Sequence, residues 1–224
     1  MIPFRHDNPS RRVPIVTLGI FTLNLVVFLY GRLLGVSGSE VFTASWAAIP
    51  FELTHGVDAI TPTPFPVFAT LATSLFMHEG LLHIAGNMLY LLVFGKNVED
   101  VLGHFSYLVF YLFCGFAATL AHVATEPGSM IPLVGASGAI AGVLGAYLAA
   151  FPSTRVQVFV PIFFFFKVPA SFVLGLWFVV QLFSAWMDSG LGGGVAWYAH
   201  IGGFVVGFLL MKRKSRRFRQ VAVY

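Results

Sequence analysis

The chain has little charge and almost no cysteine. Only 10% of its 224 residues are charged, whereas 58% are hydrophobic and the mean hydropathy is +0.85. This balance excludes an ordinary soluble globular protein, and the length leaves room for several apolar helices of about 20 residues but for no sizeable soluble domain. The single cysteine, Cys114, lies in an apolar run, which excludes a disulfide framework.

Basic residues are scarce between the two ends of the chain. The formal net charge is +4, and most of the 13 Lys and Arg residues lie near the termini, beside hydrophobic segments. Basic clusters in this position set the orientation of membrane proteins. We therefore expect the lipid bilayer, and no nucleic acid, as the partner of these residues.

The hydrophobic pattern predicts an all-α membrane protein with six spanning helices. With six spans, 12 of the 13 Lys and Arg residues fall on the same side as both termini, and only Arg32 falls on the other. The positive-inside rule then makes both termini cytoplasmic, and an odd number of spans would separate the two basic ends. The expected spans are residues 14–34, 80–98, 105–124, 133–151, 168–187 and 195–211. The expected domains are a cytoplasmic tail over 1–13, the membrane domain over 14–211 and a basic cytoplasmic tail over 212–224.

Three connecting segments carry further expectations. Residues 41–53, within the long proline-containing connection after the first span, are amphipathic and are expected to lie in the membrane interface. The apolar run 162–166 is too short to span, so we expect an interfacial loop or an extension of the fifth helix. The glycine-rich residues 189–194 are flexible enough to cap a site, and the bulky fifth helix is a candidate movable side wall.

Four polar residues fall at a similar depth in the predicted helices. Ser137 and His200 lie near the outer ends of the fourth and sixth spans, and His83 and Asn87 lie near the outer end of the second. At about 1.5 Å per residue, all four are within roughly 10–15 Å of the outer surface. Because polar groups are costly inside a membrane, their convergence from three distant segments indicates a functional site.

The chemistry of these four residues fits nucleophilic acyl transfer. Ser137 has small neighbours that let a substrate backbone approach, and His200 is a suitable general base. His83 and Asn87 are spaced i, i+4 on one helix face, so together with the backbone N–H of Ser137 they can donate hydrogen bonds to an oxyanion. This mechanism requires no cofactor and no metal.

Taken alone, each of these features also fits a different role. Gly138 and Gly142, like Gly203 and Gly207, have the four-residue spacing that serves close helix packing. A lone histidine in a membrane helix is often a packing or gating residue. An intramembrane zinc protease is excluded because His78 and His83 are spaced i, i+5 and not i, i+4.

Three motifs in this order resemble the rhomboid family of intramembrane serine proteases. Residues 78–88 (HEGLLHIAGNM) resemble the helix-two signature, with its histidine pair and asparagine. Residues 135–138 (GASG) resemble the GxSG serine motif, and residues 199–207 (AHIGGFVVG) resemble the AHxxGxxxG motif. The resemblance covers nearly all of the expected six-helix bundle.

The resemblance implies a Ser137–His200 dyad with no carboxylate, and an oxyanion hole that includes His83 and Asn87. It implies cleavage of single-pass membrane-protein substrates near the outer face. The alternative is a rhomboid-like protein of weak or no activity that binds and routes membrane-protein clients. The expected location is a plasma membrane or bacterial inner membrane, because the first 13 residues resemble no transit peptide.

One position departs from the family pattern. Many relatives carry an aromatic residue four positions after the serine, where it stacks on the catalytic histidine, and this chain has Ala141 there. Another ring is therefore expected to orient His200, and the candidates are Tyr198, Trp197 and Tyr147.

Overall fold

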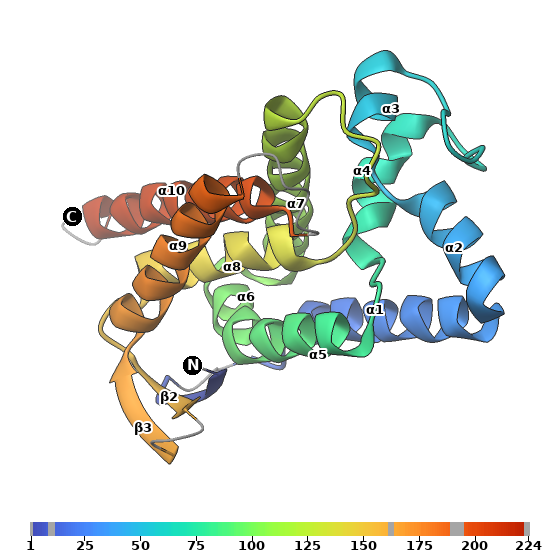
Figure 1. The fold of residues 1–224 in the computed structure, drawn as a ribbon. Helices are drawn as coiled ribbons and strands as arrows, with labels where there is room; N and C mark the ends of the chain where they lie inside the picture. The colour runs from blue at the N-terminus through green and yellow to red at the C-terminus, as the bar shows by residue number, and fades with distance from the viewer. Residues whose placement is uncertain (1, 9–11, 161–163, 189–194, 222–224) are drawn as a thin grey trace.

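The computed structural model describes residues 2–8, 12–160, 164–188 and 195–221, and side chains up to residue 214 (Figure 1). The glycine-rich segment 189–194 lies outside the described residues. The elements in chain order are β1 (Ile2–His6), α1 (Ile15–Leu33), α2 (Gly35–Trp46), α3 (Pro50–His55), α4 (Thr70–Thr73), α5 (Leu81–Tyr90), α6 (Lys96–Leu102), α7 (His104–Thr125), α8 (Ser137–Ala150), β2 (Arg155–Val160), β3 (Phe164–Pro169), α9 (Ala170–Met187) and α10 (Trp197–Val221). Two 3₁₀ turns, Val67–Ala69 and Ser74–Phe76, flank α4, and a π-helical turn, Leu91–Gly95, joins α5 to α6.

The chain is mostly helical, and four of its described helical segments are long and apolar enough to cross a membrane. They are Ile15–Leu33, Leu81–Leu102, His104–Thr125 and Ala170–Met187. Each begins or ends within a few residues of an expected span. Helix α8 has only 14 residues, so it is roughly 21 Å long and shorter than a hydrocarbon core of about 30 Å.

Helix α8 lies at the centre of the bundle, between α7 and α10 (Figure 1). Every residue from 138 to 147 is buried. The reason is the small-residue pattern on both α8 and α10: a Cβ at Gly207 would collide with the backbone oxygen of Gly142, and one at Gly145 with that of Phe204. Glycine at these positions therefore lets the two backbones approach closely enough to pack without intervening side chains.

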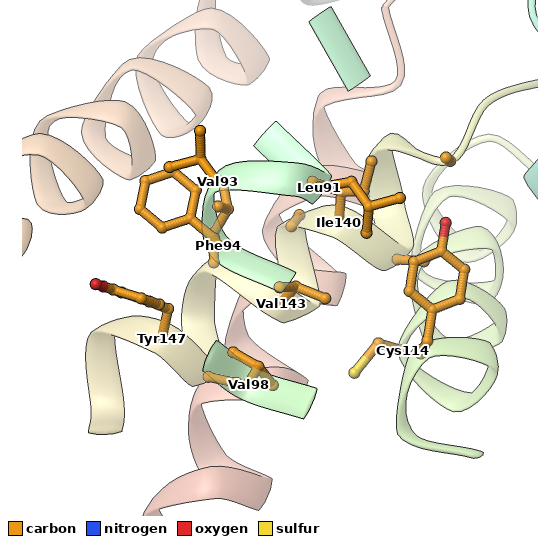
Figure 2. Close-up of a cluster of buried hydrophobic side chains, with 14 of the residues drawn as sticks. Leu91, Val93, Phe94, Val98, Cys114, Ile140, Val143 and Tyr147 are labelled. Atoms are coloured by element: carbon orange, nitrogen blue, oxygen red, sulfur yellow. The ribbon is translucent and has the colours of Figure 1, made fainter. Parts of the chain in front are cut away.

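The apolar core connects the second span to α8 and α7 (Figure 2). Leu91, Phe94 and Val98 from the second span are fully buried beside Val143 and Tyr147 of α8. Cys114, from α7, is buried in the same cluster and carries a free thiol. This packing holds the second span against α8, which fixes the relative height of the polar residues that the two helices carry.

The expectation of an all-α protein is wrong, because the structure contains a three-stranded sheet with the order β1-β2-β3. β2 pairs with β3 and with β1, both antiparallel. The sequences RVQVFV and FFFKVP are rich in Val and Phe, which favour strands. The described part of the apolar run 162–166 is accordingly strand and neither a loop nor helix, and part of the expected N-terminal tail is β1.

Two helix boundaries also differ from expectation. Helix α8 begins at Ser137 and not at residue 133, because Leu133 pairs as an isolated antiparallel bridge with Ala48. Helix α10 runs from Trp197 to Val221, so the basic residues after 211 continue the helix without a break. The four long apolar helical segments lie close to their expected bounds, whereas the start of α8 and the end of α10 do not.

The connection between α1 and α5 supports the start of α8. The backbone N–H of Phe51 donates to Ser129 O (3.0 Å), and that of Gly135 donates to Ser74 O (2.9 Å). Helices α2 to α4 and the sheet lie at opposite ends of the bundle (Figure 1). Through the two backbone hydrogen bonds, the connection between α1 and α5 holds the residues that precede Ser137.

Candidate active site

Ser137 and His200 meet at the facing ends of α8 and α10. Ser137 is the first residue of α8, and His200 lies in the first turn of α10. Ser137 Oγ and His200 Nε2 are 2.9 Å apart, which is hydrogen-bond distance. The expected fourth span, residues 133–151, would have put Ser137 about one turn inside its helix. Its place at the N-terminus instead leaves its backbone N–H without a partner within the helix.

Gly135 shapes the approach to the serine. Its φ is +123°, a backbone conformation that side chains rarely adopt. A Cβ at this position would also lie 2.8 Å from His83 Nε2 and 3.6 Å from Ser137 Oγ. The first glycine of the GASG motif is therefore required both by the turn and by the histidine ring that lies against it.

Gln181 of α9 is the second hydrogen-bond partner of His200, and it was not anticipated from the sequence. Its Oε1 lies 2.7 Å from His200 Nδ1, and its side chain is 5% exposed. Gln181 Nε2 donates to the backbone oxygen of Trp177 at 3.4 Å. The available signal was a single amide within the apolar helix Ala170–Met187, since such a residue needs a partner.

Two tryptophan rings surround the histidine in place of the missing aromatic residue of α8. The Trp177 and His200 ring centroids are 6.0 Å apart with an interplanar angle of 36°, and those of Trp197 and His200 are 6.2 Å apart at 89°. Ala141 is fully buried. Of the expected candidates, Trp197 contacts His200, whereas the Tyr147 ring lies against Phe94 and His6.

His83 and Asn87 come from the first turns of the second span. Asn87 is 8% exposed, and its Nδ2 lies 3.0 Å from His78 Nε2. The rings of His78 and His83 are in edge contact, with centroids 5.0 Å apart. Burial, followed by the charge of His83, lowers the pKa of His78 to about 4, so His78 is neutral at pH 7 and can accept the Asn87 hydrogen bond.

One cavity joins these residues. Its volume is about 480 Å³, and its lining includes all four residues that the sequence predicts for the site. Trp177 forms part of its wall on α9, and Gly135 and Gly138 border the serine. The cavity can therefore hold a peptide bond beside a serine, a histidine and several hydrogen-bond donors.

Comparison with known proteins decides the family. A family model described as a rhomboid domain matches residues 67–217, which is more than half of the chain. The chain belongs to the rhomboid family. The match covers the whole site, from the residues before His78 to those beyond His200, and the protein is thus an integral, multi-pass membrane protein.

Several curated rhomboid proteins are similar to this one. Rhomboid protein 1, mitochondrial, of Saccharomyces cerevisiae is 28% identical over 193 residues, 83% of this chain and 52% of the relative. RHOMBOID-like protein 6, mitochondrial, of Arabidopsis thaliana is 28% identical over 144 residues, which are 62% of this chain and 41% of the relative. Presenilin-associated rhomboid-like protein, mitochondrial, of Bos taurus is 37% identical over 138 residues, which are 58% of this chain and 36% of the relative. The chain thus spans about half or less of the length of these rhomboid relatives.

Proposed function

We propose that this rhomboid protein is an intramembrane serine endopeptidase that cleaves single-pass transmembrane substrates near the outer face of the membrane. The observation that carries the proposal is the 2.9 Å contact between Ser137 Oγ and His200 Nε2 at the edge of a cavity of about 480 Å³. A serine hydroxyl bonded to an imidazole nitrogen, with space for a peptide beside it, is the arrangement that nucleophilic acyl transfer requires.

The reaction takes place in two steps. His200 Nε2 accepts the hydroxyl proton as Ser137 Oγ attacks the scissile carbonyl carbon, and the resulting imidazolium then gives that proton to the leaving amine. The C–N bond breaks and leaves an ester on Ser137. A water molecule, deprotonated by the same Nε2, attacks the ester carbonyl and releases the new carboxyl terminus, and the proton returns to Ser137 Oγ.

Three donors near Ser137 support a proposed oxyanion hole. The backbone N–H of Ser137 has no acceptor within α8, because Ser137 is in the first turn of that helix. The Asn87 amide carries two N–H groups, of which one is directed at His78, so the other is available to the cavity. His83 lies against Gly135 within reach of the serine. Together they form the proposed oxyanion hole.

The proposed topology has six spans with both termini in the cytoplasm. The distribution of Lys and Arg supports it. In this orientation the N-terminus of the short helix α8 lies below the outer surface, and Ser137 is reached through the cavity. For location we propose a plasma membrane or bacterial inner membrane. Several similar rhomboid proteins are named mitochondrial, so fractionation must test a mitochondrial membrane as the alternative.

The alternative function is binding and routing of membrane-protein clients without cleavage. Relatives of that kind have lost the serine or the histidine, whereas both are present here and in contact. Retention of this contact favours the protease.

The decisive experiment is cleavage of a model single-pass substrate in proteoliposomes by the wild type, Ser137→Ala and His200→Ala. Matched controls are Ser171→Ala, an exposed serine on α9, and His55→Ala, an exposed histidine on α3. We expect the product only with the wild type and the controls. Product from Ser137→Ala at the wild-type rate would show that the serine mechanism is wrong.

A further inference from the structure

Gln181 is a buried amide in a helix that is otherwise almost entirely apolar. Its side chain is 5% exposed, and its neighbours on α9 are mainly apolar and include Val, Leu, Phe and Trp. A buried amide without partners is costly, and in a membrane helix water does not relieve the cost. The place of Gln181 is therefore explained only by the groups that its two polar atoms contact.

The two contacts fix the direction of the amide. Gln181 Nε2 lies 3.4 Å from the backbone oxygen of Trp177, which can only accept, so this nitrogen donates. Gln181 Oε1 is then the atom that faces His200 Nδ1 at 2.7 Å. Because an amide oxygen can only accept, the proton of the neutral imidazole must be on Nδ1.

We propose that Gln181 is a positioning residue that selects the tautomer and the orientation of His200. With the proton held on Nδ1, the lone pair of Nε2 points at Ser137 Oγ, which is the arrangement that proton transfer from the serine needs. This inference rests on the proposed protease function. It makes the site a chain of three hydrogen-bonded groups, with a neutral amide where soluble serine proteases have a carboxylate.

The membrane setting explains why an amide suits this position. A carboxylate buried among apolar side chains has a large desolvation cost, whereas an amide accepts the same hydrogen bond without a charge. When His200 becomes an imidazolium, Gln181 Oε1 can still accept from Nδ1 and so stabilises the charge by its dipole. Trp177, one helical turn before Gln181, adds a ring contact to the same imidazole.

Gln181 acts on the histidine and not on the substrate. It is absent from the described lining of the cavity, whereas Trp177 and His200 are part of it. Loss of Gln181 is therefore expected to lower kcat and leave KM unchanged. Since one neutral hydrogen bond is lost, we expect a decrease of about 10-fold in kcat.

The test compares three variants of the 224-residue chain. Gln181→Met keeps the approximate size and removes both polar atoms, Gln181→Glu restores an acceptor, and Gln157→Met is the matched control on β2. Cleavage kinetics give kcat and KM. Nitrogen-15 NMR of histidine-labelled protein in detergent gives the tautomer of His200, whose signals are identified by their loss in His200→Ala.

The expected result has two parts. In the wild type and in Gln157→Met, His200 is held as the Nδ1–H tautomer. In Gln181→Met, His200 exchanges between its two tautomers and kcat falls. Gln181→Glu recovers most of the tautomer preference and most of the kcat. Wild-type kcat together with an unchanged tautomer in Gln181→Met overturns the positioning role while leaving the protease function intact. A wild-type protein that cleaves no substrate contradicts the proposed function. The NMR measurement still decides whether Gln181 holds His200 in the Nδ1–H tautomer.

Discussion

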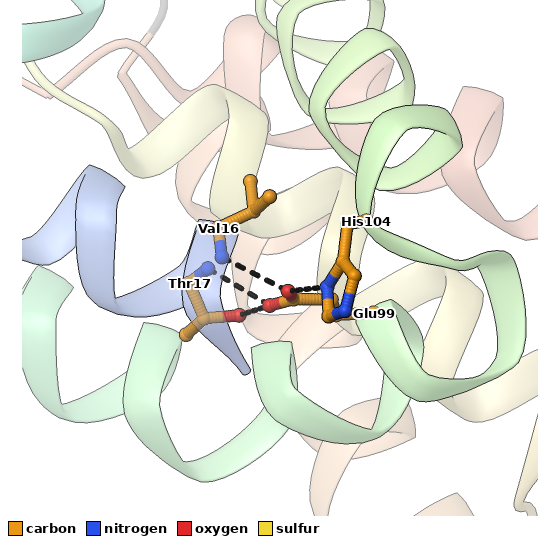
Figure 3. Close-up of polar contacts among 4 residues, drawn as sticks. All are labelled: Val16, Thr17, Glu99 and His104. Carbon is orange, nitrogen blue, oxygen red and sulfur yellow. Dashed lines mark hydrogen bonds and ion pairs between the residues drawn. The ribbon is translucent and has the colours of Figure 1, made fainter. Parts of the chain in front are cut away.

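Two clusters in this protein each combine a hydroxyl, a histidine and a third polar side chain, and only one is suited to catalysis. At one end of the bundle, His200 joins Ser137 to Gln181. At the opposite end of the second span, Glu99 accepts hydrogen bonds from the Thr17 hydroxyl (2.6 Å) and pairs with His104 Nδ1 (2.6 Å) (Figure 3). The residue types are similar, but the order of connection differs.

That order decides what each cluster can do. In the first, the histidine is in the middle, so one nitrogen is held while the other faces the hydroxyl. In the second, the carboxylate is in the middle and also accepts from the backbone N–H groups of Val16 (2.9 Å) and Thr17 (2.8 Å). Glu99 thus caps the start of α1 and ties it to α6 and α7. The His104 ring bonds the carboxylate and not the Thr17 hydroxyl, so this cluster is structural.

The largest expected effect separates the two clusters by activity. Ser137→Ala and His200→Ala should each lower kcat by about 10⁴-fold or more, because the nucleophile and base act as a unit. Thr17→Val and His104→Ala should keep the wild-type kcat and lower the thermal unfolding midpoint. Cleavage assays and thermal unfolding in the same detergent measure both. A large loss of kcat in a Thr17→Val protein that is still fully folded would show that the Glu99 cluster is not purely structural.

A smaller effect on activity is expected at the oxyanion hole. Asn87→Ala should lower kcat by roughly 10²- to 10³-fold, the range for loss of one oxyanion donor. The matched control is Asn97→Ala, which removes a buried amide that donates to Asn8 O far from the cavity. Its expected effect is on stability alone. Equal kcat values for Asn87→Ala and Asn97→Ala would show that Asn87 is not a donor in the proposed oxyanion hole.

The catalytic cluster also depends on close contact of α8 and α10. Gly207→Ala places a Cβ against the Gly142 backbone oxygen, so we expect a loss of about 1–3 kcal/mol in unfolding free energy. Gly19→Ala on α1, where no other described part of the chain beyond the adjoining helix backbone lies within 4 Å of the new Cβ, is the matched control and should be neutral or slightly stabilising. The two denaturation curves measure the difference, and identical curves would show that the α8–α10 contact is not tight.

The sequence predicted the residues of the cavity better than their connections. Ser137, His200, His83 and Asn87 line one cavity, and each lies in the first or second turn of its helix, so counting residues from the expected outer ends of the spans already gave them a similar depth. Gln181 was missed because its role depends on which face of α9 meets α10. The lone amide of α9 indicates that a partner exists, but a single sequence does not show which neighbouring helix supplies that partner.

Elements whose structure depends on distant partners were the ones missed. The strands β2 and β3 have six residues each, and although their Val and Phe favour strands, segments this short become a sheet only by pairing, β2 with β3 and with β1. Residues 133–136 continue the apolar pattern of α8, yet the bridge between Leu133 and Ala48 keeps this segment out of the helix. In both cases a long-range contact overrides a local pattern.

The smallest expected effect sharpens the contrast between the buried Glu99 cluster and an exposed ion pair. Lys167 Nζ on β3 lies 2.7 Å from Asp7 Oδ1, and each side chain is about half exposed. The hydrogen bond from Lys167, aided by its charge, lowers the pKa of Asp7. A carboxyl group whose pKa is lowered by folding stabilises the fold above its unfolded pKa of about 3.9, and this contribution disappears as the pH falls through the lowered value.

Lys167→Met should therefore lower the thermal midpoint slightly at pH 7 and not at all near pH 2, where Asp7 is protonated in both proteins. Asp7→Asn removes the same pair from the other side and should behave alike. The effect is small because water and salt screen exposed charges, whereas the carboxylate of Glu99 is 1% exposed and saturated with hydrogen bonds. A difference that persists at pH 2 would mean that Lys167 stabilises the sheet through the packing of its methylene chain, and not through its charge.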